Sequence, residues 1–515
     1  MPGINVTTAV RQGPTGNGDI VAGQWFVVGE AERGDITKPT LCRSFSDYVR
    51  EYGDYQAGNL YQYVKTYFDE GGTRCYVQRV LGASYATATK TFQDTAGSPA
   101  NTITIAAKNP GKWGNTISVE ILTSADATVA ISGYFRIKIY LNSVLIFTSR
   151  DLKDVPDAVN FINESRTVNH LVVASNESAS SLNPKAYAAT ALASGANGTN
   201  AATAAEHVTG LAKFTTDLKN GAVSAPGVYD NTTRDGLLSH VEAHNRVALF
   251  ALAAGTSVDT AITTAASEYT DTAASYTAYY WPHVKVPSPS ATELASYVAA
   301  GATATTAEPD PESATVTIDP TAYAAAARAR AVQSSGGPWR PGAGAISAAR
   351  TIVDLNQAVS PADGDRLDEG RVNAMRKIGN SIRVYGARSV SSDETNWRYI
   401  TLRDTINHVV YGVESRMEEF IFNTIDSRGN LFGRIEASIV AFLDPMRVSG
   451  GLYEARNDSN QLVDPGYVVT VDGTNNPNSQ LAQGIVKATV GVRVAGVVDM
   501  IEVEVTKSTL NSPVI

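Results

Sequence analysis

Apolar and polar residues alternate at both ends of the chain. Residues 2–7 alternate at the front and residues 500–506 at the back, and neither segment has a hairpin partner beside it in the sequence. A period of two predicts a strand with one buried face. Such a strand must pair at long range or with another molecule, and head-to-tail strand addition builds an open helical array. The residues predicted to take part in inter-subunit strand exchange are Ile4, Val6, Ile501, Val503 and Val505.

The N-terminal part predicts a compact α/β segment. Apolar runs at 25–29 and 75–80 indicate two strands. Helices are expected after the capping residues Ser44 and Asn59, and the second helix carries its apolar side chains on one face.

The next part of the chain is rich in strand patterns. Strands are predicted at 102–106, 116–122 and 135–147, a helix at 155–163 and another strand at 170–174. We interpret this stretch as a β-rich inserted domain.

Helix and strand patterns alternate again in the middle of the chain. The predicted strands lie at 246–252 and 278–286, and helical stretches lie around 203–220, 257–275 and 320–333. This order favours a layered α/β domain.

Two long apolar stripes at helical spacing dominate the C-terminal part. The first covers 402–421 after a capping arrangement of Thr401 and Asp404, and the second covers 431–443 and is expected to stop before Pro445. Ordinary core packing is the favoured interpretation of both stripes. Further strands are expected at 467–471 and 486–494.

These patterns predict a multidomain α/β (α+β) chain. It has a C-terminal α+β core, terminal strand-exchange arms, a β-rich inserted domain and an α/β middle domain. The expected parts are an N-terminal linking arm (1–20), an N-terminal α/β segment (21–84), a β-rich inserted outer domain (85–200), an α/β middle domain (201–350), a C-terminal core (351–498) and a C-terminal linking strand (499–515).

Composition narrows the class of protein. The 515 residues are 43% hydrophobic and 18% charged, which is typical of a globular chain. The net charge of −9 argues against direct coating of nucleic acid. No apolar run reaches the roughly 18 residues that span a bilayer, and no secretory signal is expected. Cys42 and Cys75 are interpreted as buried reduced thiols.

The sequence contains no motif that predicts a catalytic, cofactor or metal site. His240 and His244 have helical spacing, but Val241 stands where a zinc protease needs glutamate. The glycine-rich stretch 13–18 lacks the lysine and the strand-to-helix context of a phosphate loop.

Several segments, in order, resemble the contractile tail sheath family of phages and related injection machines. They are Ala31-Glu32-Arg33-Gly34 with Pro39 and the expected helix from Phe45 to Gly53, the Gly71–Val80 segment ending in Arg79-Val80, the Asn109–Asn115 turn, Ala225-Pro226-Gly227, Tyr279-Tyr280-Trp281-Pro282, Val372-Asn373, Val384–Ser389, and Tyr399-Ile400 with the helix to Phe422. The chain departs from the family pattern at Gly337–Gly342, at Asn197 and at 493–501.

The resemblance implies a structural sheath subunit rather than an enzyme, located in the virion tail after assembly in the host cytoplasm. Its implied partners are further copies of itself, an inner tail tube protein, and baseplate and tail terminator proteins, with no cofactor and no direct contact to nucleic acid or membrane. One of the C-terminal helices is expected to face the tube. The candidate tube contacts are Arg403, Arg416, Arg428 and Arg434.

Two alternatives remain open. The first alternative is another structural tail or baseplate assembly protein. The second is an α/β enzyme that uses the domain at 205–350. A phage tail, a bacteriocin and a cellular injection device are all compatible with the resemblance.

Overall fold

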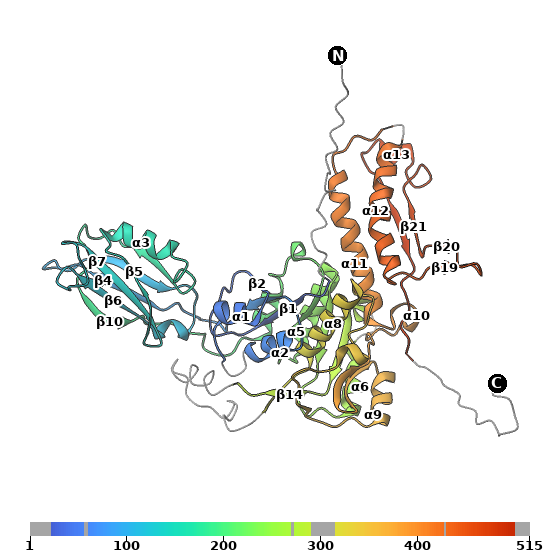
Figure 1. Ribbon diagram of the computed structural model, residues 1–515, viewed down its shortest axis with the longest axis horizontal. Helices are drawn as coiled ribbons and strands as arrows, with labels where there is room; N and C mark the ends of the chain where they lie inside the picture. The colour runs from blue at the N-terminus through green and yellow to red at the C-terminus, as the bar shows by residue number, and fades with distance from the viewer. Residues whose placement is uncertain (1–21, 56–59, 269–271, 290–314, 427–428, 500–515) are drawn as a thin grey trace, which may run out of the picture.

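The computed structural model describes residues 22–55, 60–268, 272–289, 315–426 and 429–499. They form three parts: a layered α/β body, a β-rich domain at one end of the molecule, and a unit with two long helices that lie side by side (Figure 1). The predicted mixed α/β, multidomain fold class is confirmed.

The body is built on an eight-stranded sheet in the order β18-β17-β13-β12-β11-β1-β3-β2. The strands are β1 (Trp25–Gly29), β2 (Thr40–Cys42), β3 (Cys75–Arg79), β11 (Ala222–Ser224), β12 (Val247–Ala251), β13 (Thr277–Trp281), β17 (Val372–Ile378) and β18 (Ser381–Tyr385). The inner strands run parallel, and β2 and β18 pair antiparallel at the two edges. Parallel strands covered on both faces explain the fully buried apolar runs of β1 and β12.

Helices cover both faces of this sheet and produce two separate cores. One face carries α1 (Phe45–Tyr52), α2 (Tyr61–Asp69) and α8 (Thr321–Ser335), and the other carries α4 (Ala204–Leu211), α5 (Asn231–His244), α6 (Val258–Glu268) and α9 (Pro361–Glu369). Trp25 and Val27 of β1 enter the first core, whereas Phe26 and Val28 enter the second. The alanine-rich α8 is buried on nearly every side, as expected of a helix enclosed by other elements.

A three-stranded sheet lies beside the body. It contains β14 (Val284–Pro287), β15 (Thr315–Ile318) and β16 (Asp354–Leu355), with β14 in the middle. The strand predicted at 278–286 is therefore two strands, β13 and β14, in different sheets. Pro282 lies between them, and proline has no N–H to donate to a ladder.

The β-rich domain contains two antiparallel sheets around a core of its own. One sheet holds β4 (Thr89–Gln93), β5 (Asn101–Ala107) and β9 (Val172–Asn176), and the other holds β6 (Ile117–Thr123), β7 (Phe135–Leu141), β8 (Val144–Thr148) and β10 (Tyr187–Ala191). Helix α3 (Val155–Glu164) packs on β9.

Short 3-10 helices lie in the β-rich domain and the body. They are η1 (Lys112–Thr116), η2 (Thr216–Leu218), η3 (Thr272–Tyr276) and η4 (Gly344–Ser347).

The C-terminal unit extends away from the body (Figure 1). It contains α10 (Glu394–Trp397), α11 (Ile400–Met417), η5 (Glu418–Phe420), α12 (Asn430–Val448), β19 (Ala455–Arg456), β20 (Leu462–Asp464), β21 (Tyr467–Thr470), α13 (Asn478–Leu481) and β22 (Thr489–Val492). The apolar stripes of α11 and α12 meet in one core, so they are packing surfaces.

Three predicted helix boundaries are wrong. Leu60, not Asn59, holds the N-cap position of α2. Tyr399 holds that position in α11, and Asp404 is instead buried in an ion pair. Helix α12 continues past Pro445 to Val448, because Met446 extends the apolar stripe and is buried in the same core.

Three of the predicted segments share one sheet. Strands from 21–84, from 201–350 and from 351–498 all enter the eight-stranded sheet, so the three segments are joined by backbone hydrogen bonds. Strand pairing at long range is invisible in a local pattern. The domain boundaries themselves stay a prediction.

Candidate assembly surfaces

The two-stranded sheet of β21 and β22 is the first candidate surface. The strands pair antiparallel from Tyr467 opposite Val492 to Thr470 opposite Thr489. Among the described residues, each strand pairs along one side only. One face of the sheet packs on the helical core through Val469 and Val490.

A sheet of this size is marginally stable alone and presents unpaired backbone groups along its outer edges. Val468, on the face away from the helices, is 60% exposed. The arrangement therefore offers backbone donors and acceptors to an added strand. The predicted strand-exchange residues Ile4, Val6, Ile501, Val503 and Val505 lie outside the described residues, so their role stays a prediction.

Helices α11 and α12 form the second candidate surface, and they approach each other closely. A Cβ atom built on Gly412 would lie 2.1 Å from Cζ of Phe442. A larger residue at this point would require the Phe442 ring or one of the helices to shift.

Arg403 is held inside the chain. Its Nε and Nη2 donate to Oγ of Ser275 at 2.9 and 2.7 Å, and its guanidinium lies 3.5 Å from the ring centroid of Trp397. It also lies 4.2 Å from the ring centroid of Tyr276. Burial lowers the pKa of Arg403. These contacts join α11 to η3, and they leave less of the guanidinium for a partner.

The other candidate arginines differ in exposure. Arg416 donates to the carbonyl of Gly412 at 3.0 Å and lies 4.4 Å from the ring centroid of Phe442. Arg434 is exposed on α12 and lies 5.4 Å from the ring centroid of Phe420. Arg428 lies outside the described residues. A role in contacting a tube stays a prediction for all four arginines.

A buried ion pair fixes the base of α11 to α8. Nε and Nη2 of Arg328 donate to the Asp404 carboxylate at 2.6 and 2.8 Å, and Asp404 is 3% exposed. Burial raises the pKa of Asp404, while the charge of Arg328 acts in the opposite direction. The bidentate geometry is the strong form of an arginine–carboxylate pair.

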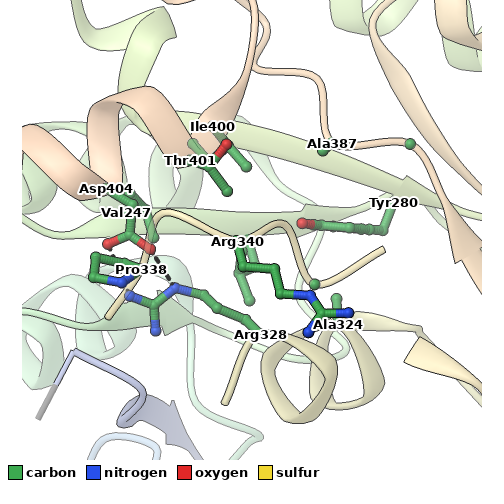
Figure 2. Close-up of a pocket in the computed structure, with 13 residues that line it drawn as sticks. Val247, Tyr280, Ala324, Arg328, Pro338, Arg340, Ala387, Ile400, Thr401 and Asp404 are labelled. Atoms are coloured by element: carbon green, nitrogen blue, oxygen red, sulfur yellow. Dashed lines mark hydrogen bonds and ion pairs between the residues drawn. The ribbon is translucent and has the colours of Figure 1, made fainter. Parts of the chain in front are cut away.

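A small cavity adjoins this ion pair. Figure 2 shows Thr401, Tyr280 and Arg340 around it, with the Asp404 carboxylate turned toward Arg328. Its volume is about 20 Å³, which is enough for one water molecule. Oγ1 of Thr401 and Nη1 of Arg328 are buried without a protein partner, so a single bridging water fits their chemistry.

A second set of ion pairs holds the last described residue. Oδ2 of Asp499 accepts from Nη2 of Arg388 at 3.1 Å and from Nη2 of Arg398 at 2.9 Å. Sequence patterns missed these pairs and the Arg328–Asp404 pair, because ion pairs between distant segments leave no local periodicity. Arg328 in an apolar alanine-rich helix was the one available signal, since a buried charge requires a partner.

The histidine pair serves packing. Nε2 of His240 accepts from Nη1 of Arg246 at 2.8 Å, and burial lowers the pKa of His240 to about 3.

Within the described ranges no group of three or more His, Cys, Asp or Glu side chains could hold a metal ion. Cys42 and Cys75 are buried free thiols that face each other across β2 and β3. None of the helices in those ranges has the length and apolar character needed to cross a membrane.

The fold is that of contractile sheath proteins. The sheath tail protein from Listeria innocua matches with a TM-score of 0.58 and 14% identity, over 88% of this chain and 89% of that chain. A chain of the anti-feeding prophage baseplate in its contracted state matches with a TM-score of 0.57 and 14% identity, over 98% of both chains.

A chain of the PVC sheath complex, from an extracellular contractile injection system in its contracted state, matches with a TM-score of 0.52. It has 14% identity over 99% of this chain and 98% of that chain. The sequence matches no protein-family model and no curated protein. The similarity therefore resides in the three-dimensional arrangement, which confirms the expected sheath fold.

Proposed function

We propose that this chain is a structural subunit of a contractile tail sheath. It polymerises helically around an inner tube and contracts to drive the tube through a target envelope. One observation carries the proposal: a chain from a contracted sheath shares the fold over 99% of this chain and 98% of its own length. Such coverage includes the body, the inserted domain and the C-terminal unit together.

In this proposal the two chain ends link neighbouring subunits. Residues 2–7 and 500–506 add strands to the open edges of the β21–β22 sheet in other copies. Each backbone hydrogen bond contributes about 0.5–1.5 kcal/mol net. Several links per subunit act together, so a lattice can hold while its subunits rotate. Contraction then releases free energy stored in a kinetically trapped extended polymer, without nucleotide hydrolysis.

The proposed partners are other copies, an inner tube protein, and baseplate and tail terminator proteins. The proposed location is a tail assembled in the host cytoplasm, with no enzymatic activity and no direct contact to nucleic acid or membrane. A second candidate is a structural role confined to the baseplate. The observation that favours it is that two of the similar chains come from baseplate structures.

Electron microscopy of the purified full-length protein tests the proposal. We expect long hollow helical polymers for a sheath subunit, closed rings or short discs for a baseplate part, and dispersed monomers for an enzyme. Polymers of uniform diameter support the first role, and exclusively dispersed monomers contradict it.

Deleting residues 1–20 tests the strand-exchange mechanism. We expect the deletion to abolish polymer growth because it removes one donated strand, and we expect a folded monomer with an unchanged melting temperature. Deleting residues 500–515 should have the same effect. Sedimentation and circular dichroism measure both results, and full-length polymers from either deletion variant would contradict the mechanism.

A further inference from the structure

The chain runs from the C-terminal unit back to the body just before the predicted linking strand. The amide of Ala495 donates to the carbonyl of Gly451 at 3.1 Å, which within the described residues is the last backbone bond to the C-terminal unit. Val498 is 76% exposed. The carboxylate of Asp499 then meets Arg388 and Arg398 at 3.1 and 2.9 Å. Residues 496–498, of which 496 and 498 are exposed, thus form a short connection between two attachment points.

The attachment point at Asp499 is prepared by the fold. Arg388 is 8% exposed, and its Nε and Nη2 hold the Asp368 carboxylate of α9. The backbone of Arg388 exchanges hydrogen bonds with the side chain of Asn373 in β17, at 2.7 and 3.0 Å. Asp368 therefore holds the guanidinium, and Asn373 holds the backbone of the same residue, independently of Asp499.

The charges at this point balance only when Asp499 is present. Arg388 and Arg398 supply two cations, and Asp368 and Asp499 supply two carboxylates. Within the described residues, Asp499 is the only carboxylate that pairs with Arg398. Burial and a hydrogen bond to Asp499 also raise the pKa of Tyr399, so the phenol stays protonated and donates.

We propose that Asp499 is a positioning residue that fixes the point and the direction from which the C-terminal strand leaves the subunit. The inference rests on the proposed function for its biological meaning. A strand that leaves from a fixed point loses less orientational freedom on docking into a neighbour, so it has a higher effective concentration there.

The first experiment uses the unassembled full-length protein and does not depend on polymerisation. Thermolysin cleaves beside aliphatic residues such as Val497 and Val498. We expect about two- to tenfold faster cleavage there in Asp499→Asn and in Arg398→Gln, because partly exposed ion pairs have this order of strength. Asp365→Asn, which changes an exposed aspartate of α9, is the matched control. Mass spectrometry locates the cuts, and equal cleavage in all proteins overturns the proposal.

The second experiment measures assembly. The critical concentration for polymerisation should rise about two- to tenfold in Asp499→Asn, with an unchanged melting temperature. The double variant Asp499→Asn, Arg398→Gln should show no further increase, since Asp499→Asn already removes the Arg398 pair together with the Arg388 pair. Additive effects overturn the proposal. If the unchanged protein forms no polymer, the proposed function fails, while the cleavage result still decides the role of Asp499.

Discussion

Gly412 shows how a single missing side chain sets the spacing of α11 and α12. A Cβ at this position would lie 2.1 Å from Cζ of Phe442, whereas a Cβ at Gly433, also in a helix, meets nothing within 4 Å. We expect Gly412→Ala to lower the free energy of unfolding by about 1–3 kcal/mol through overpacking. Chemical denaturation measures the loss.

The matched control is Gly433→Ala. Because alanine is the better helix former, this change should raise the free energy of unfolding by about 0.5–1 kcal/mol. A Gly412→Ala protein as stable as the Gly433→Ala protein would show that the two helices separate easily.

His408 makes stability depend on pH. It lies on α11, is 5% exposed, and has its pKa lowered to about 4, chiefly by burial and further by the charges of Arg328 and Arg416. The unfolded chain, with an ordinary histidine pKa near 6.5, binds the proton first as pH falls. The stability that neutral His408 contributes is therefore fully present above about pH 6.5, and this contribution is lost as the pH falls from about 6.5 to about 4.

The variant His408→Phe keeps an aromatic ring beside Phe442 and removes the titration. We expect its stability to fall less over this range, by roughly 2–3 kcal/mol relative to the unchanged protein. Denaturation midpoints at several pH values measure the slope, and parallel curves for the two proteins would contradict the assignment. His240, whose pKa is also lowered by burial, continues to titrate in both.

Helices α11 and α12 present different arginines to a partner. Arg434 is exposed on α12, and Arg403 is engaged with Ser275 and Trp397. Arg434→Glu should weaken co-sedimentation of the polymer with an inner tube protein, with no change in melting temperature. Arg403→Glu should instead destabilise the monomer by about 1–3 kcal/mol, since stacking and hydrogen bonds are lost.

Thermal melting and co-sedimentation together separate these two effects. Unchanged co-sedimentation of the Arg434→Glu polymer would refute a tube contact for this residue. The same measurement on Arg416→Glu tests the end of α11, where part of the side chain already serves packing.

Elements with strong local periodicity were predictable from sequence. Strand β1, helix α1 with its Ser44 cap, and the apolar stripes of α11 and α12 lie where the pattern placed them. Helix α5 and the short strand β11 were not predicted. Polar residues interrupt the apolar spacing of α5, and β11 is three residues long, so packing in the sheet determines both.

The predicted strand-exchange residues lie outside the described residues, so that part of the site stays a prediction. Alternation at residues 500–506 predicts a strand that pairs at long range or with another molecule. Among the described residues, the outer edges of β21 and β22 are unpaired and could accept such a strand. The anchoring pair of Asp499 and Arg398 joins residues that are 101 positions apart, and no local pattern carries such a contact.

The β-rich domain is joined to the body through two adjacent chain segments. Ala86 and Ala196 exchange backbone hydrogen bonds at 3.0 and 2.9 Å, and the amide of Thr199 donates to the carbonyl of Ala83 at 3.0 Å. The domain has a hydrophobic core of its own. Its entry and exit therefore lie side by side.

We expect residues 85–197 to be replaceable by a short glycine–serine linker. The remaining body should fold, with a lower melting temperature because Nη1 of Arg79 loses its bond to the carbonyl of Pro110. The excised fragment should fold alone, since its core is complete. Circular dichroism and two-dimensional NMR measure both results, and an unfolded fragment or body would contradict this view of the junction.

The backbone bridge between Ala86 and Ala196 also has a practical consequence. A foreign domain can be inserted at this junction if its two ends lie about 5 Å apart, which is the spacing of hydrogen-bonded neighbouring backbone segments. An enzyme, an epitope or a carbohydrate-binding module grafted there would be displayed once on every copy of the chain. Because two adjacent segments join the domain to the body, evolution can also replace the domain without changing the eight-stranded sheet.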